Sequence, residues 1–164
     1  MSLERDARDA ISVLSAHKVR FVVIGGIAAV LLGSPQLTFD LDVCYARDPD
    51  NFEALAAALR ELGARLRGAP ENLPFQLDAE TLRNGDSFTF ATEAGNVDVL
   101  GTPLGTTGYS QLMRDAWAAT LGGVDVAVAS LDMLIRMKEA AGRPKDRAAL
   151  ESLYALRDRL ENPR

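Results

Sequence analysis

The sequence has little cysteine, no excess of basic charge and no long apolar run. Its single cysteine, Cys44, excludes a disulfide within the chain. Acidic residues outnumber basic ones by 23 to 18, and a net charge of −5 is poorly suited to non-specific binding along nucleic acid. The longest apolar run, 25–33, is too short to span a membrane, and the polar N-terminus does not resemble a signal peptide. We therefore expect a cytoplasmic protein that does not contact membranes.

What is present is typical of one soluble domain. The 164 residues are 48% hydrophobic and 25% charged, which is enough to bury a core. No repeat, low-complexity segment or linker divides the chain. We predict a single domain over 1–164, with its core at about 19–128 and a helical C-terminal part at about 130–161. Basic residues gather in two places and leave a local anion site open: Arg65 and Arg67, and then Arg143, Lys145 and Arg147.

Apolar periodicity and turn signals predict helices and strands in mixed order, which is an α+β class. The predicted helices are 3–16, 26–32, 49–62, 130–141 and 144–160. The predicted strands are 21–24, 41–45, 87–91, 96–100, 116–121 and 124–128. Asp48 and Ser130 are expected to cap the helices that they precede. We expect 67–85, which contains Gly68, Pro70 and Pro74, to be irregular, either as a functional loop or as a loop that holds a short element.

Three aspartates are candidates for a metal site. Side chains alternate along a strand, so Asp40 and Asp42 share one face, and Asp98 is expected on the same face of a neighbouring strand. Adjacent carboxylates repel unless a cation lies between them, and Mg²⁺ is the hard cation that carboxylates bind together with phosphates. An isolated Asp-x-Asp is also common on the solvated face of an edge strand. Asp125, between two valines, has that pattern and receives no functional role.

Gly25 and Gly26 stand between a predicted strand and a predicted helix. Without Cβ atoms, the backbone can come close to a ligand, and the amides at a helix start favour an anion such as phosphate. A tight turn that needs glycine for steric reasons is the alternative. The aspartates that follow fourteen to seventeen residues later favour the phosphate interpretation.

Lys138 falls within the apolar face of its predicted helix. A lysine in that position must extend to solvent or pair with an anion, either a nucleotide phosphate or Asp146. Asp146 itself lies on the apolar face of the last predicted helix, although an acidic residue in a first turn also suits the helix dipole.

Together these motifs resemble the nucleotidyltransferase superfamily of the DNA polymerase β type. Within it, the sequence is most similar to the small prokaryotic branch of AbiEii-like proteins and minimal nucleotidyltransferases. The similarity covers about 21–156 and rests on a strand with Gly-Gly, a later glycine, Thr-x-Asp-x-Asp, and a basic C-terminal segment. The matching residues are Val23-Ile24-Gly25-Gly26, Gly33, Thr38-Phe39-Asp40-Leu41-Asp42, Asp98, Leu134 to Lys138 and Arg143 to Arg147.

The resemblance implies a nucleotidyltransferase fold, a mixed β-sheet flanked by helices with further helices at the C-terminus. It also implies a two-metal Mg²⁺ site at Asp40, Asp42 and Asp98, the catalytic residues, with Asp98 helping to activate the acceptor hydroxyl. The NTP substrate would be bound by four residues: Gly25, Gly26, Thr38 and Lys138. Relatives often carry a basic residue shortly before the threonine, where this chain has Gln36 and Leu37, so a cation near the phosphates is missing.

Two functions follow from the resemblance. The first is Mg²⁺-dependent transfer of an NMP from an NTP to a hydroxyl of a tRNA, a protein or a small molecule. A toxin–antitoxin system is one setting in which such a transfer would occur. The second is a non-catalytic module of the same fold that acts by binding a partner protein, a toxin or an antitoxin.

Overall fold

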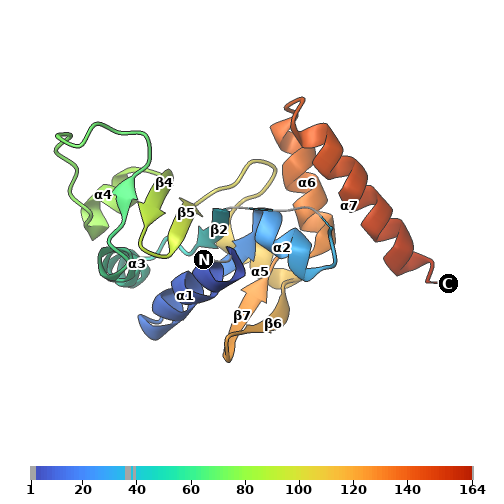
Figure 1. Ribbon diagram of the computed structural model, residues 1–164, viewed down its shortest axis with the longest axis horizontal. Helices are drawn as coiled ribbons and strands as arrows, with labels where there is room; N and C mark the ends of the chain where they lie inside the picture. The colour runs from blue at the N-terminus through green and yellow to red at the C-terminus, as the bar shows by residue number, and fades with distance from the viewer. Residues whose placement is uncertain (1–2, 36–37, 39, 164) are drawn as a thin grey trace.

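The computed structural model describes residues 3–35, 38 and 40–163, which form an α+β fold with a central sheet (Figure 1). The helices are α1 Leu3–Ala16, α2 Gly25–Leu31, α3 Pro49–Glu61, α4 Ala79–Asn84, α5 Tyr109–Arg114, α6 Leu131–Ala141 and α7 Asp146–Glu161. The strands are β1 Phe21–Ile24, β2 Asp40–Tyr45, β3 Arg65–Leu66, β4 Ser87–Thr92, β5 Gly95–Leu100, β6 Trp117–Leu121 and β7 Val124–Val128.

The sheet is mixed and follows the order β3-β4-β5-β2-β1-β7-β6. The β4–β5 and β6–β7 hairpins are antiparallel, as is the β1–β2 pair. Strands β2 and β5 are parallel, and so are β1 and β7. This topology places β2 and β5, the strands with the three aspartates, side by side in the middle of the sheet.

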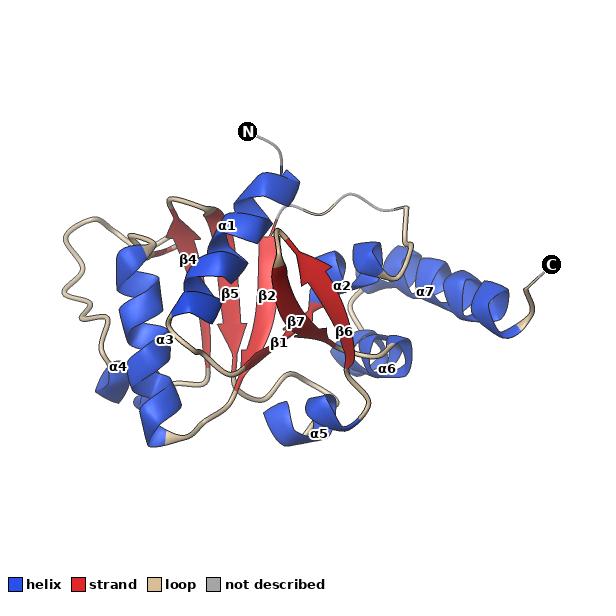
Figure 2. Cartoon of the chain, turned by 90° about the horizontal axis from the view of Figure 1, so that it is seen from below, coloured by secondary structure: helices blue, strands red, loops and turns tan. Residues whose placement is uncertain are grey.

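Two helices cover one face of the sheet, and two others pack together at one end of the molecule. Figure 2 shows α1 and α3 on the same face of the sheet, and α6 with α7 together beyond the β1–β7 side. In Figure 1, α6 and α7 lie at one end of the molecule, while α3, α4 and the β3–β4 edge lie at the other. The aspartate strands therefore lie between the two ends.

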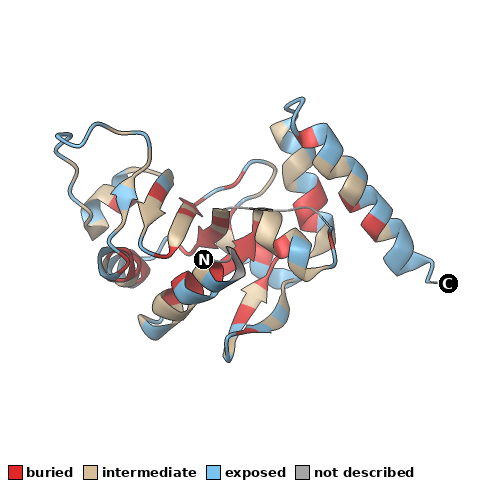
Figure 3. Cartoon of the chain, in the orientation of Figure 1, coloured by how far each residue is buried: buried red, intermediate tan, exposed pale blue. Residues whose placement is uncertain are grey.

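The core follows the alternation of the sequence. Leu41 and Val43 of β2 and Val97 and Val99 of β5 are buried, which leaves the aspartates between them on the opposite face. All four residues of β1 are buried, as its continuous apolar character predicts. Figure 3 shows the buried residues concentrated on the central strands and on one side of α1.

The expected irregular stretch 67–85 contains a short helix at residues 79–84, the kind of short element that the sequence pattern left open but did not locate. Asp78 caps α4 by accepting a hydrogen bond from the Thr81 amide at 2.8 Å. Helix α5 and the two-residue strand β3 were not predicted either. Each is six residues or fewer, too short for a repeating apolar pattern to become visible.

The two predicted helix caps differ in outcome. Ser130 accepts a hydrogen bond from the Met133 amide at 3.2 Å, which confirms its capping role. Asp48 precedes α3 but its side chain makes no cap hydrogen bond. Its carboxylate pairs instead with Arg20, 2.7 Å from Nη2, because a charged partner competes for the oxygens that a cap would use. None of the helices in the described ranges combines the length and apolar character needed to cross a bilayer.

Candidate active site

The register of β2 and β5 brings two of the predicted carboxylates directly together. Asp42 lies opposite Asp98, and Asp40 lies opposite Asn96. Because each pair is two residues from the other along its strand, all four side chains share one face of the sheet. The structure thus places the three aspartates in the arrangement that strand alternation predicts, in central strands rather than at an edge.

Burial strongly perturbs the ionisation of this group. Burial, the largest cause, and the negative charge of Asp98 together raise the pKa of the Asp42 carboxyl to about 7. A hydrogen bond to Asp98 and the charge of Asp40 act in the same direction, while Lys138 opposes them. Burial also raises the pKa of Asp98, against the opposing charge of Arg67. Near neutral pH, Asp42 therefore holds its proton far more tightly than an exposed aspartate does.

One carboxylate oxygen of Asp98 is buried without a hydrogen-bond partner among the described residues. This oxygen, Oδ1, lies 2.9 Å from Arg67 Nη2. The contact is a close ion pair between the Arg67 guanidinium and the Asp98 carboxylate. The same Nη2 lies 3.9 Å from Asp40 Oδ2. Arg67 therefore places a positive charge beside Asp98 and Asp40, where the sequence predicts a metal ion.

A divalent cation fits one part of this group. Asp42 and Asp98 are adjacent, and a buried oxygen without a hydrogen bond is a suitable donor to a hard cation. Asp40 is oriented differently: its Oδ1 accepts a hydrogen bond from Asn96 Nδ2 at 3.1 Å. Within the described ranges, no three His, Cys, Asp or Glu side chains form a set arranged to hold a metal. The Asp42–Asp98 pair is the part that fits, and Asp40 as a third ligand stays a prediction.

The Gly-Gly turn packs tightly against this group. Gly25 has a φ of +68°, and a Cβ there would come within 2.9 Å of Asp42 Cγ. A Cβ on Gly26 would lie 2.7 Å from Thr38 Cβ. Both glycines thus have a steric reason to lack a side chain. The same packing brings the start of α2 next to Asp42, which is also the place that phosphate binding requires.

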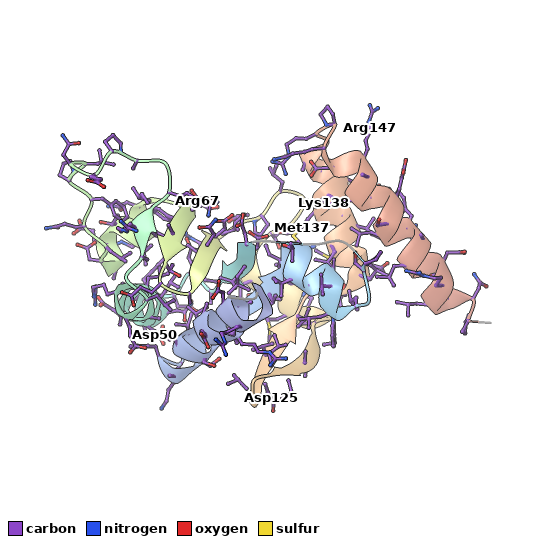
Figure 4. The ribbon with its side chains drawn as sticks, in the orientation of Figure 1. Asp50, Arg67, Asp125, Met137, Lys138 and Arg147 are labelled. Carbon is purple, nitrogen blue, oxygen red and sulfur yellow. The ribbon has the colours of Figure 1, made fainter. Side chains whose placement is uncertain are left out.

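A cavity of about 490 Å³ opens beside the aspartates. It is lined by both glycines of the turn and by Asp42 and Asp98. Helices α6 and α7 contribute apolar side chains and Lys138, and the loop between them contributes Arg143. Figure 4 shows Arg67 near the β4–β5 side and Lys138 with Met137 on α6 across from it. The cavity therefore has carboxylates on its sheet side and cations on its helical side, and its size suits a drug-sized ligand.

Lys138 pairs with Asp146, one of the two anions that the sequence left open. Its Nζ lies 3.2 Å from Asp146 Oδ1, and the Asp146 side chain is only 2% exposed. Arg143 Nε binds the other carboxylate oxygen at 2.8 Å. These hydrogen bonds, that from Arg143 above all, lower the pKa of Asp146 to about 2. A contact between Lys138 and a phosphate stays a prediction.

Some residues near the site were not recognised as part of it from sequence. Arg67 and Arg143 stood out only as members of basic clusters, because their partners are distant in sequence or lie across a turn. No sequence signal marked Arg67, because it follows β3, a strand of only two residues in which no alternation is visible. Gln36 and Leu37, where relatives often have a basic residue, lie outside the described residues.

The fold of this chain matches that of solved nucleotidyltransferase structures. No protein-family model matches the sequence, and no curated protein matches it. Solved structures, in contrast, are similar to this chain in fold. The lincosamide antibiotic adenylyltransferase LnuA, with lincomycin bound, has a TM-score of 0.58 at 12% identity, over 89% of this chain and 92% of LnuA.

Two further structures are similar to this chain. TM1012 from Thermotoga maritima, assigned as a nucleotidyltransferase, has a TM-score of 0.54 at 16% identity, over 90% of this chain and 89% of its own. The antibiotic-resistance factor ANT(2'')-Ia has a TM-score of 0.55 at 16% identity, over 93% of this chain and 83% of its own. At these identities the similarity establishes the fold; the AbiEii-like branch within it stays a prediction.

Proposed function

We propose that the chain is a Mg²⁺-dependent nucleotidyltransferase, which transfers an NMP from an NTP to a hydroxyl acceptor. One observation carries the proposal: the half-buried Asp42–Asp98 pair, with its raised pKa values, faces a cavity lined by Lys138 and Arg143. Neighbouring carboxylates whose pKa values are raised inside a cavity are more typical of functional sites than of stabilising ion pairs. The nucleotidyltransferase fold supports this activity by analogy.

Asp42 and Asp98 would hold Mg²⁺ with Asp40 as a third ligand, in the proposed two-metal site. When bound, Mg²⁺ would neutralise charge on the triphosphate and on the departing pyrophosphate. The start of α2 at Gly25 and Gly26 would approach the β- and γ-phosphates next to Asp42. Thr38, in contact range of Gly26, would support that end of the nucleotide.

In the proposed reaction, the acceptor oxygen bonds to the α-phosphorus while the bond to the β-phosphate oxygen breaks. Pyrophosphate leaves, and Asp98 helps to take the proton of the acceptor hydroxyl. Lys138 and Arg143 would offset phosphate charge on the far side of the cavity. Positioning and charge stabilisation supply most of the rate in such a transfer.

A small molecule is the first acceptor class to test. The printed description of LnuA names a lincosamide antibiotic, and ANT(2'')-Ia is named as an antibiotic-resistance factor. Much of the cavity surface is apolar, which suits a partly apolar acceptor. A tRNA or a protein acceptor, the latter within a toxin–antitoxin system, remains as a further proposal for the same reaction.

The proposal is tested by incubating the protein with Mg²⁺, α- or γ-labelled NTPs, and panels of small-molecule, tRNA and protein acceptors. We expect the α-label to move to an acceptor and the γ-label to leave as pyrophosphate. Asp42→Asn and Asp98→Asn should abolish the transfer. Asp125→Asn is the matched control, because Asp125 sits on the exposed β6–β7 hairpin and should leave the rate unchanged. Transfer that survives in Asp42→Asn would refute the assignment.

One observation favours the second candidate, binding without turnover. Arg67 already supplies a positive charge to Asp98 and Asp40, so the group can exist without a metal ion. A calorimetric titration with Mg²⁺ and ATP separates the two functions. Failure to bind nucleotide, together with stable binding of a partner protein, would favour the module over the enzyme.

A further inference from the structure

Arg67 continues a row of side chains that crosses the sheet. Asp42 lies opposite Asp98, and Asp98 lies opposite Thr89 on β4. Just beyond β3, the Arg67 amide donates to the Thr89 carbonyl at 2.9 Å, so Arg67 takes the next position in the row. The row therefore delivers its side chain to the face of the sheet that carries the aspartates.

The backbone holds the Arg67 guanidinium from one side only. Its Nη1 donates to the Phe90 carbonyl at 3.3 Å, and its Nη2 reaches Asp98 Oδ1 at 2.9 Å. The Nη2 contact with Asp98 is an ion pair to a buried oxygen, and the charge of Arg67 affects the pKa of Asp98 more than a hydrogen bond from Arg67 does. Another cation can therefore supply what the guanidinium mainly provides at this oxygen.

Other cations near the aspartates are engaged elsewhere. Lys138 influences the pKa of Asp42, yet its ammonium pairs with Asp146. Arg143 is bound to the same Asp146. Among the ion pairs described, Arg67 is the cation that touches Asp98 and Asp40, and it occupies the space beside the oxygen that a metal ion would use.

We propose that Arg67 is an internal counter-ion that competes with the divalent cation for Asp98. This inference rests on the proposed cation site. In the metal-free protein, the guanidinium positions Asp98 and limits repulsion within the group. Entry of a divalent cation requires the guanidinium to leave Asp98, because two positive groups cannot share one buried oxygen without strong repulsion. Arg67 thereby weakens binding of the free cation, so that a cation accompanied by a triphosphate is favoured.

The competition is measured by titrating Mn²⁺ into the nucleotide-free protein by calorimetry. We expect Arg67→Ala to bind Mn²⁺ about 10-fold more tightly than the wild type, because a like charge within about 4 Å of the site is removed. The stability of Arg67→Ala without metal should fall, and Mn²⁺ should raise its Tm by more than it raises that of the wild type. Arg67→Gln, which removes the charge and keeps most of the stem, provides the same comparison if the alanine variant folds poorly.

Two controls separate competition from general electrostatics. Arg65→Ala removes a charge from the same strand without removing an ion pair to the aspartates, and should leave the affinity nearly unchanged. Arg67→Lys keeps the charge and should retain most of the competition. Equal tightening in Arg65→Ala and Arg67→Ala would overturn the inference.

The remaining outcomes distinguish the inference from the proposed function. If the wild type binds Mn²⁺ and the Arg67→Ala and Arg67→Gln variants bind it with unchanged affinity, the competition is refuted and the cation site stands. Binding only in the Arg67 variants would support the inference strongly. If the wild type and every Arg67 variant fail to bind Mn²⁺, the cation site is refuted and the inference falls with it. An Asp98→Asn variant shows which heat signal belongs to this site.

Discussion

Two carboxylate environments on opposite sides of the cavity, one buried at Asp146 and one half-buried at Asp42 and Asp98, have opposite electrostatics. At the start of α7, Asp146 is 2% exposed and is bound by both Lys138 and Arg143, which lower its pKa to about 2. On the sheet, Asp42 has another carboxylate, Asp98, as its neighbour, and its pKa rises to about 7. The charge of Asp146 is balanced by its two cationic partners, whereas the negative charge around Asp42 is not fully balanced.

The difference separates a carboxylate that holds the fold together from carboxylates that are available for function. A paired buried charge costs stability when one partner is removed. Carboxylates without enough cations already cost stability, and a fold keeps such a group for a ligand. Arg67 reduces that cost at Asp98 through an ion pair with its buried oxygen. The two environments should therefore respond in opposite ways to the same substitution.

Asp42→Asn should have the largest effect, on activity. We expect the rate of nucleotidyl transfer to fall by about 10³-fold or more, because a ligand of the proposed cation is lost. Asp146→Asn should lower the rate far less when assayed at a temperature where it remains folded. Initial rates of α-label transfer measure both. A greater loss of activity in Asp146→Asn than in Asp42→Asn would reverse the roles assigned here.

Asp146→Ala should have the largest effect on stability. Removing the buried carboxylate leaves Lys138 and Arg143 without their partner, and the free energy of unfolding should fall by about 2–4 kcal/mol. Urea unfolding measures the change. Glu151→Ala, an exposed acidic residue on the same helix, is the matched control and should change stability by less than about 0.5 kcal/mol. Equal losses in the two variants would contradict a structural role for Asp146.

The pH dependence of stability should differ in sign between the two aspartates. Because the folded-state pKa of Asp42 is raised, its contribution is present at pH values below about 4 and is lost as pH rises through about 7. The contribution of Asp146, whose pKa is lowered, is present above about pH 4 and is lost as pH falls towards 2.

Without divalent cations, the wild type should lose about 1 kcal/mol relative to Asp42→Asn between pH 6 and 8. Thermal unfolding of both proteins with a chelator, at several pH values, measures this difference. Parallel pH profiles for the two proteins would show that Asp42 has an ordinary pKa.

Lys138→Met should have the smallest effect on the fold. Methionine suits the apolar face of α6, and Arg143 still neutralises Asp146, so we expect a loss of about 1 kcal/mol or less. If Lys138 also offsets nucleotide charge, the affinity for Mg–ATP should fall by about 3–10-fold. Calorimetry on the folded variant gives the affinity. An unchanged affinity would confine Lys138 to its pair with Asp146.

Strand patterns predicted much of the fold and the shape of the site. Alternation placed Asp40, Asp42 and Asp98 on one face, and the register of β2 with β5 agrees. The helical wheel marked Lys138 as misplaced and offered Asp146 as one partner. These predictions succeeded because each depends on a local period of two or about 3.6 residues.

Contacts between distant segments could not be predicted in this way. The ion pair of Arg67 with Asp98 depends on the pairing of β3 with β4, and β3 is only two residues long. The wrong prediction for Asp48 has the same origin: capping is local, and the partner that prevails, Arg20, is 28 residues away. The cavity likewise requires α6 and α7 to lie beside the sheet, which no periodicity encodes.

The central claim is that the carboxylates short of positive charge on β2 and β5 are the functional site. Calorimetric titration of Mg–ATP into the wild type, Asp42→Asn and Asp146→Asn tests it most directly, at a temperature where all three are folded. We predict that the wild type and Asp146→Asn bind Mg–ATP with similar affinity, and that Asp42→Asn loses most of its binding. Equal affinity in the wild type and Asp42→Asn would contradict the account.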